Sequence, residues 1–207
     1  MSAPRLLLLT DRSQLRLGRG LVRTVHECAD AGLVHAGVVV VREHDLAPDE
    51  RAALVAALRT VPGLRVLASR TDLPGAHGLH LSARGAAPGG ARPWGRSCHD
   101  RADLVRAAAE GAAWATLSPW AATASKPGYG PPVARSAFAD APLPVLALGG
   151  VEPGSVQGAV AAGAHGVAVM GAVMRAAEPA RVVEALVREL AHAVGQRAEQ
   201  SVGEGVA

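Results

Sequence analysis

The chain has 207 residues, of which 49% are hydrophobic and only 2% aromatic, so we expect one domain whose large core is filled by Val, Leu and Ala. The net charge of +3 comes from arginines spread along the chain, with Lys126 as the single lysine, and the lack of a basic block argues against nucleic-acid binding. Cys28 and Cys98 lack metal-ligand spacing, and no apolar run is long enough to span a membrane, so we expect a cytoplasmic protein without a membrane partner.

Eight apolar runs of strand length follow one another along the chain. They are Leu6-Thr10, Gly37-Val41, Leu64-Ala68, Gly78-Leu81, Trp94-Ser97, Ala113-Ser118, Val145-Leu148 and Gly166-Met170. Helical patterns separate several of them or follow the last one, at Leu21-Ala31, Pro48-Val61, Arg101-Glu110, Gly154-Ala162 and Pro179-Val194. This alternation predicts an α/β fold with a parallel sheet, and eight strands match a closed (β/α)8 TIM barrel.

Two connections of the predicted barrel lack a helical pattern. Asp72-His77 is too short for a helix, and Ala83-Pro93 is crowded with glycine and proline. The barrel should therefore be irregular around its third and fourth βα units. After a single barrel domain at residues 1–194, the polar segment 195–207 has no apolar periodicity and predicts a flexible C-terminal tail.

The last two predicted strands both end in glycine. One run leads into Gly149-Gly150, the other into Gly171, and a single helical stretch lies between them. Glycines at the carboxyl ends of parallel strands let backbone N–H groups approach an anion, and the last two strands of TIM barrels often bind phosphate. A glycine pair alone also suits a mere tight turn. The two glycine turns together favour a small-molecule phosphate ligand.

Polar side chains follow other predicted strands. After the sixth run, Thr123, Ser125 and Lys126 offer two hydroxyl groups and a cation, a suitable set for phosphate oxygens. Arg42 follows the second run and suits an anion, although these residues by themselves slightly favour a rim ion pair with Glu43.

Ser97 and His99 follow the fifth run, where Ser97 is placed to donate a hydrogen bond to a ligand and His99 to act on a proton. Capping of the next helix by Ser97 or Asp100 is an alternative interpretation of this segment. His80 falls within a predicted strand and is interpreted as a core histidine.

These motifs, in this order, resemble the thiamine phosphate synthase and TenI family of (β/α)8 barrels from Leu6 to about Leu190. The resemblance is carried by LLLLTDR, VVVREHD, SRTDL, GLHLS, GRSCH, TASKPGYG, LALGGV and GVAVMGAV. It implies a thiazole phosphate pocket formed by Thr123, Ser125, Gly150, Met170 and Gly171. It also implies that Arg42, Ser97 and Lys126 face a neighbouring pyrimidine pocket.

The two branches of this family imply different chemistry. In the synthase, a pyrimidine methyl diphosphate loses pyrophosphate with the help of magnesium, and the thiazole nitrogen attacks the resulting cation. Here Ala68 and Ser69 replace the family's Asn-Asp pair before the arginine of SRTDL, and the carboxylate expected after GLHL is absent from Ser82 to Gly85. Val40 and His44 replace the Gln and Lys beside the second-strand arginine. Magnesium, which prefers oxygen ligands, is thus expected only in a true synthase, and no other cofactor or metal is expected.

The TenI branch resembles isomerases that move protons on a thiazole carboxylate phosphate without magnesium, and the sequence favours this branch. Its acid/base histidine aligns with Pro119, which has no proton to transfer, so His44 and His99 are the candidate catalytic residues. Two alternatives stay open: a true synthase with rearranged metal ligands, and a phosphate-ligand-binding protein without catalysis. A homo-oligomer is compatible with either.

Overall fold

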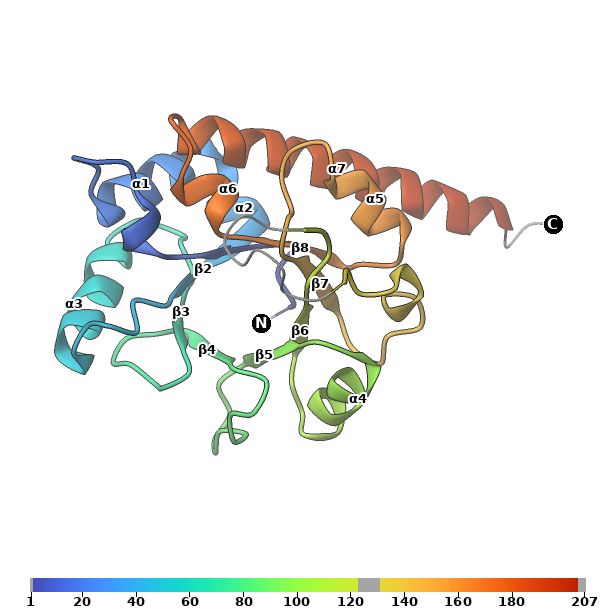
Figure 1. Ribbon diagram of the computed structural model, residues 1–207, viewed down its shortest axis with the longest axis horizontal. Coiled ribbons are helices and arrows are strands. Elements are labelled where there is room, and N and C mark those ends of the chain that lie inside the picture. Colours follow the sequence, from blue (N-terminus) through green and yellow to red (C-terminus); the bar gives the residue numbers. More distant parts are fainter. Residues whose placement is uncertain (1, 123–130, 205–207) are drawn as a thin grey trace.

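A computed structural model describes residues 2–122 and 131–204 of the chain. Eight parallel strands close into a barrel in sequence order, each hydrogen-bonded to the next and β8 to β1 (Figure 1). They are β1 (Leu6–Leu9), β2 (Gly37–Val41), β3 (Val66–Ser69), β4 (Gly78–Leu81), β5 (Trp94–Cys98), β6 (Trp114–Leu117), β7 (Val145–Leu148) and β8 (Gly166–Val169). The prediction of a (β/α)8 barrel is confirmed.

Helices surround much of the barrel. They are α1 (Leu21–Cys28), α2 (Val34–Ala36), α3 (Pro48–Leu58), α4 (Arg101–Ala109), α5 (Val156–Ala161), α6 (Gly171–Met174) and α7 (Pro179–Glu204), with short turns of helix η1 (Arg12–Gln14), η2 (Ala29–Leu33) and η3 (Arg135–Ala137). The predicted helix at Leu21-Ala31 is interrupted, because α1 passes into the wider turn η2, in which Gly32 has a φ of 99°. Within the described residues, no helix is both long and apolar enough to cross a membrane.

The predicted irregularity around β4 is present. Residues 70–77 and 82–93 contain no helix, and loops cover this part of the barrel in Figure 1. The buried Arg96 holds the second loop, because its Nη1 donates to the carbonyl oxygens of Ala83 (3.1 Å) and Gly85 (2.7 Å). Arg106 donates to the same Ala83 oxygen at 2.8 Å. Hydrogen bonds from arginine side chains to the loop backbone thus fix this connection, which has no helix.

The predicted end of the last helix is wrong. Helix α7 does not stop at Val194 but continues to Glu204. Tertiary contacts hold the extra turns: Gln157 of α5 donates to Gln196 (3.1 Å), and Arg197 donates to the carbonyl oxygen of Ala164 (3.4 Å). Because these partners lie in other elements, the apolar periodicity of the segment does not reveal them.

Two apolar layers make up the core. One lies between the sheet and the helices, and the other fills the barrel interior with Leu7, Leu9, Val38, Val40, Leu67, Trp114, Leu146 and Ala168. Trp114 is the largest fully buried side chain among the described residues. Its indole reaches across to β5, where a Cβ on Gly95 would lie 2.6 Å from Trp114 Cδ1, so only glycine fits beside it.

Replacing Trp114 by alanine should lower the free energy of unfolding by about 3–5 kcal/mol, since it leaves a cavity in the barrel interior that neighbouring strands cannot close. Urea denaturation followed by circular dichroism measures this loss. Leu17→Ala is the matched control, because the Leu17 side chain is fully exposed and its loss should change stability by less than about 0.5 kcal/mol. Equal effects of the two substitutions would contradict a packed interior.

Candidate active site at the carboxyl ends of the strands

A cavity of about 430 Å³ opens where the strands end, and every strand contributes to its wall. The contributing residues, one from each of β1 to β8 or the turn that follows, include Leu9, Arg42, Ser69, Leu81, Ser97, Ser118, Gly149 and Met170. This is the face on which barrel enzymes bind their ligands. A volume of this size suits a small molecule rather than a polymer.

Most of the predicted site residues lie together in this cavity. Its wall includes Arg42, His44, Ser97, His99, Gly149, Gly150, Met170 and Gly171. Thr123, Ser125 and Lys126 lie outside the described residues. Arg70 and Arg175 also line the cavity, and Arg175 was not predicted as a site residue. Arg70 directly follows β3, which is a sequence signal for this face, whereas Arg175 follows the short helix α6 and no local pattern indicated it.

The glycine turn after β7 is built from left-handed backbone. Gly149 has a φ of 91° and Gly150 a φ of 68°, in a region of backbone conformation that residues other than glycine rarely adopt. The segment after β6 packs directly against this turn, with the N–H of Trp120 donating to Leu148 (2.8 Å) and that of Ala121 to Gly149 (2.9 Å). Both predicted roles of the glycine pair are therefore compatible: it forms a tight turn, and that turn borders the cavity.

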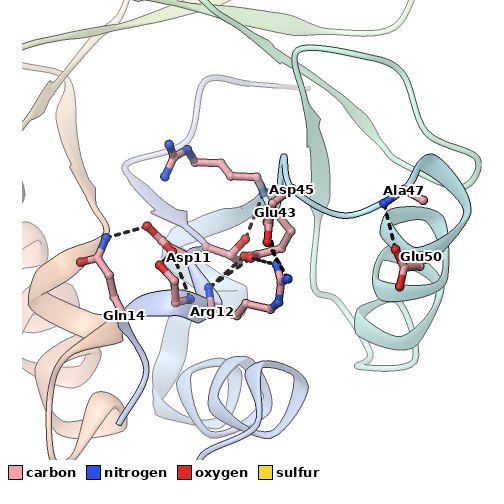
Figure 2. A network of polar contacts seen from close by, with 10 residues as sticks. Asp11, Arg12, Gln14, Glu43, Asp45, Ala47 and Glu50 are labelled. Carbon is pink, nitrogen blue, oxygen red and sulfur yellow. Dashed lines mark hydrogen bonds and ion pairs between the residues drawn. The ribbon is translucent and has the colours of Figure 1, made fainter. Parts of the chain in front are cut away.

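A network of polar contacts fixes the loop after β2 (Figure 2). Glu43, only 4% exposed, accepts hydrogen bonds from the backbone N–H of Arg12 (3.1 Å) and from its guanidinium (3.2 Å). The same guanidinium binds both oxygens of Asp45, at 2.7 and 2.6 Å. The predicted alternative of an ion pair between Arg42 and Glu43 is therefore not observed. Arg42 instead lines the cavity, with Nη1 2.7 Å from the sulfur of Met170.

Two cavity histidines, His44 and His80, are neutral at neutral pH. Burial, with the nearby Arg70 and Arg42 adding repulsion, lowers the pKa of His44 to about 4, and its Nε2 lies 3.0 Å from Ser69 Oγ. Burial and then the charge of Arg42 lower the pKa of His80 to about 4. His80 is a buried strand residue, as predicted, but it also lines the cavity floor, where its Nε2 lies 3.2 Å from Ser97 Oγ.

Ser97 and Asp100 were both considered as caps of the next helix, and the structure distinguishes them. Asp100 caps α4, accepting a hydrogen bond from the N–H of Asp103 at 2.7 Å, whereas Ser97 bonds to His80 instead. His99 Nδ1 lies 3.2 Å from the carbonyl oxygen of Ser118, which only accepts hydrogen bonds. Ser118 Oγ lies 3.3 Å from the same nitrogen. In the tautomer in which Nδ1 donates to the carbonyl, the lone pair of the neutral ring is on Nε2.

The cavity wall does not fit the magnesium of a synthase. Ala68 is a buried apolar residue, and Ser69 Oγ is within hydrogen-bond distance of His44. Nowhere in residues 2–122 and 131–204 are three His, Cys, Asp or Glu side chains grouped to hold a metal ion. Among the described wall residues, Glu152 is the single carboxylate, whereas three arginines line the wall. Such a surface suits an anion better than a hydrated cation.

The free energy of unfolding should fall as the pH drops from 6.5 to about 4, partly because His80 resists protonation in the fold. The unfolded chain binds a proton at His80 in this range and the folded protein does not, so stability rises with pH by up to about 1.4 kcal/mol per pH unit. Urea denaturation at several pH values measures the slope. His80→Gln should flatten it, and the matched control His35→Gln, an exposed histidine, should leave it unchanged. An unchanged slope in His80→Gln would contradict this assignment.

Fold and cavity together define a (β/α)8 barrel with an arginine-rich small-molecule site at the carboxyl ends of its strands. The sequence model of a family described as Thiamine monophosphate synthase matches residues 6–173. The chain belongs to this family, whose members act in thiamine biosynthesis.

Individual relatives agree with the family match. A Geobacter sulfurreducens protein provisionally named thiamine-phosphate synthase is 37% identical over 199 residues, which cover 87% of this chain and 92% of the relative. A thiamine-phosphate synthase of Methanoculleus marisnigri is 35% identical, over 82% of this chain and 87% of its own. The structure of a Pyrococcus furiosus thiamine phosphate pyrophosphorylase has a TM-score of 0.76 at 20% identity, covering 91% and 96% of the two chains, which shows the shared fold.

Proposed function

We propose that this protein is a TenI-like isomerase of thiamine biosynthesis, which binds a thiazole carboxylate phosphate and moves a proton on it without a metal ion. The observation that carries this proposal is the position of His99 on the cavity wall. Its Nδ1 lies against Ser118, directly before Pro119, the position that aligns with the acid/base histidine of that branch. His99 thus contacts the residue that directly precedes the expected place.

The proton chemistry follows from the hydrogen bond of His99. In the tautomer with Nδ1–H donating to the Ser118 carbonyl, Nε2 carries the lone pair that would remove a proton from one carbon of the ligand. The same carbonyl stabilises the imidazolium that forms, as orienting partners of catalytic histidines do. Return of that proton to another carbon of the ligand completes the isomerisation. No atom is gained or lost, and no metal is required.

The charge of the cavity supports an anionic ligand. The cavity is lined by three arginines, Arg42, Arg70 and Arg175. The left-handed Gly149-Gly150 turn borders the cavity at the carboxyl ends of β7 and β8. Thiazole carboxylate phosphate carries two anionic groups, which suits a cavity lined by several arginines. The replaced magnesium positions, Ala68 and Ser69, do not weaken this reaction, because it does not use a metal.

A true synthase is the second candidate function, and the names of the relatives favour it. The two relatives described above, at 35% and 37% identity over more than four fifths of this chain, carry the synthase name. In that case the diphosphate would have to be held by other groups than the family's carboxylates.

Two assays on the purified full chain separate these functions. In the presence of EDTA, conversion of the thiazole carboxylate phosphate tautomer, followed by proton NMR, is expected under the isomerase proposal. Formation of thiamine phosphate from pyrimidine methyl diphosphate and thiazole phosphate, only when magnesium is added, would instead assign the synthase. Binding of thiazole phosphate in calorimetry without either reaction would contradict both and leave a ligand-binding protein.

A further inference from the structure

The cation at the β8 end of the cavity comes from Arg175, which follows α6. Its guanidinium folds back over the start of that helix, so that a Cβ on Gly171 would lie 2.5 Å from Arg175 Cζ. Long side chains of helical residues point toward the preceding turn, and residues four apart share a face, so this direction is the natural one. Gly171 therefore leaves the space in which the guanidinium lies, at the edge of the cavity that both residues line.

The amide of Gln14 in η1 holds the guanidinium in place, and the carboxylate of Asp11, the N-cap of η1, holds that amide. Arg175 Nη1 donates to Gln14 Oε1, and Gln14 Nε2 donates to Asp11 Oδ2 at 2.6 Å, a contact drawn in Figure 2. A carboxylate only accepts hydrogen bonds, so Asp11 turns the NH₂ of Gln14 toward itself and leaves the amide oxygen for Arg175. Ser13 adds two further hydrogen bonds to Asp11, through its N–H (3.2 Å) and Oγ (2.6 Å).

The charge of Arg175 is not neutralised by a neighbour in the described part of the chain. The ion pairs of residues 2–122 and 131–204 do not include Arg175, and Glu152, the carboxylate on the same cavity wall, does not pair with it. Its recorded partner is the uncharged amide of Gln14. A positioned guanidinium that lines a cavity and lacks a counter-charge is suited to bind an anionic oxygen of a ligand.

We infer that Arg175 binds the phosphate group of the ligand at the β8 end of the cavity, and that Gln14, itself oriented by Asp11, sets its position. The inference rests on the phosphate ligand of the proposed function. It adds a specificity for the charged group. Neutral backbone N–H groups of the glycine turns can donate to an ester or hydroxyl oxygen as well, whereas a guanidinium discriminates in favour of a charged phosphate. Arg175 is a binding residue, and Gln14 is a positioning residue.

Calorimetry with two ligands tests this role. The wild-type protein, Arg175→Ala, Arg175→Lys and Gln14→Ala are titrated with thiazole phosphate and with the same thiazole as its free alcohol. Arg175→Ala should weaken binding of the phosphate about 10- to 100-fold, the effect of one charge-assisted hydrogen-bonded contact, and leave the alcohol unchanged. Lysine should restore part of the loss, because it keeps the charge but not the guanidinium geometry. Gln14→Ala should cause a smaller loss for the phosphate alone.

Arg181→Ala is the matched control. Arg181 is an exposed arginine of α7 that pairs with Glu178 and does not line the cavity, so its replacement removes the same charge elsewhere. The Arg181→Ala variant should bind both ligands as the wild type does. Equal affinity of Arg175→Ala and wild type for the phosphate would overturn the inference and leave the proposed function standing. Equal losses for phosphate and alcohol would also overturn it, since they would indicate a general disturbance of the cavity.

Inorganic phosphate separates this inference from the proposed function. If the wild type does not bind thiazole phosphate, the proposed function fails. Stabilisation of the wild type by inorganic phosphate in thermal unfolding, lost in Arg175→Ala and kept in Arg181→Ala, would then still support the phosphate site. If phosphate stabilises wild type and Arg175→Ala equally, or stabilises neither, the inference is overturned.

Discussion

Replacing His99 by alanine should lower the turnover of thiazole carboxylate phosphate by about 10²- to 10⁴-fold, the usual contribution of a general acid/base. Binding of the ligand should change little, because the removed group acts on the proton in transit rather than on the phosphate. Steady-state kinetics should therefore show the loss in kcat with KM nearly unchanged. Calorimetry with thiazole phosphate measures the binding independently.

His44→Ala is the matched control for this prediction. Both histidines line the cavity, but the pKa of His44 is lowered to about 4, which makes it a weak base at neutral pH, and its Nε2 is engaged with Ser69. We expect His44→Ala to keep most of the turnover. The reverse result, a large loss in His44→Ala and a small one in His99→Ala, would transfer the acid/base role to His44. Full turnover in both variants would exclude either histidine as the acid/base.

Replacing Gly150 by alanine should weaken binding of thiazole phosphate more than about 100-fold, since it deforms the turn that borders the phosphate end of the cavity. A Cβ at this position would lie 2.6 Å from the carbonyl oxygen of Ala122 and 2.8 Å from Ala121, so the segment after β6 must move away. The φ of 68° adds backbone strain of about 1–3 kcal/mol. Calorimetry measures the affinity, and urea denaturation measures the stability.

Gly154→Ala separates strain from the shape of the site. Gly154 has a φ of 92°, but no atom lies within 4 Å of the position of its Cβ, and it does not line the cavity. This variant should be destabilised by a similar strain energy and bind the ligand normally. If it lost as much affinity as Gly150→Ala, the effect would be one of stability and the glycine turn would have no specific part in binding.

Local patterns were sufficient to predict the strands and the glycine turns. A strand of a parallel barrel is buried on both faces, so its apolar run is visible in the sequence, as at Gly37–Val41 and Val145–Leu148, where the predicted and observed bounds agree. The glycine turn after β7 was visible because left-handed backbone favours glycine, so a glycine pair directly after an apolar run marks a turn.

Contacts between distant segments were not predictable in this way. Glu43 pairs with Arg12 across two strands, and Arg175 reaches Gln14, which is 161 positions earlier in the chain. Ser97 was considered as a helix cap, whereas closure of the sheet places its hydroxyl next to His80. Each of these choices depends on which side chains the closed barrel brings together, and no periodicity along the chain records it.

The sequence by itself determined the barrel, its eight strands and the face that carries the site, because burial of both faces of each strand and the need for glycine are properties of single segments. Only the tertiary structure decided which groups can act there. Barrel closure sets His99 against Ser118 and the guanidinium of Arg175 over Gly171, and it extends α7 beyond Val194 through contacts with α5. Hydrogen bonds and charges act between neighbours in space, so their partners are known only when the fold is.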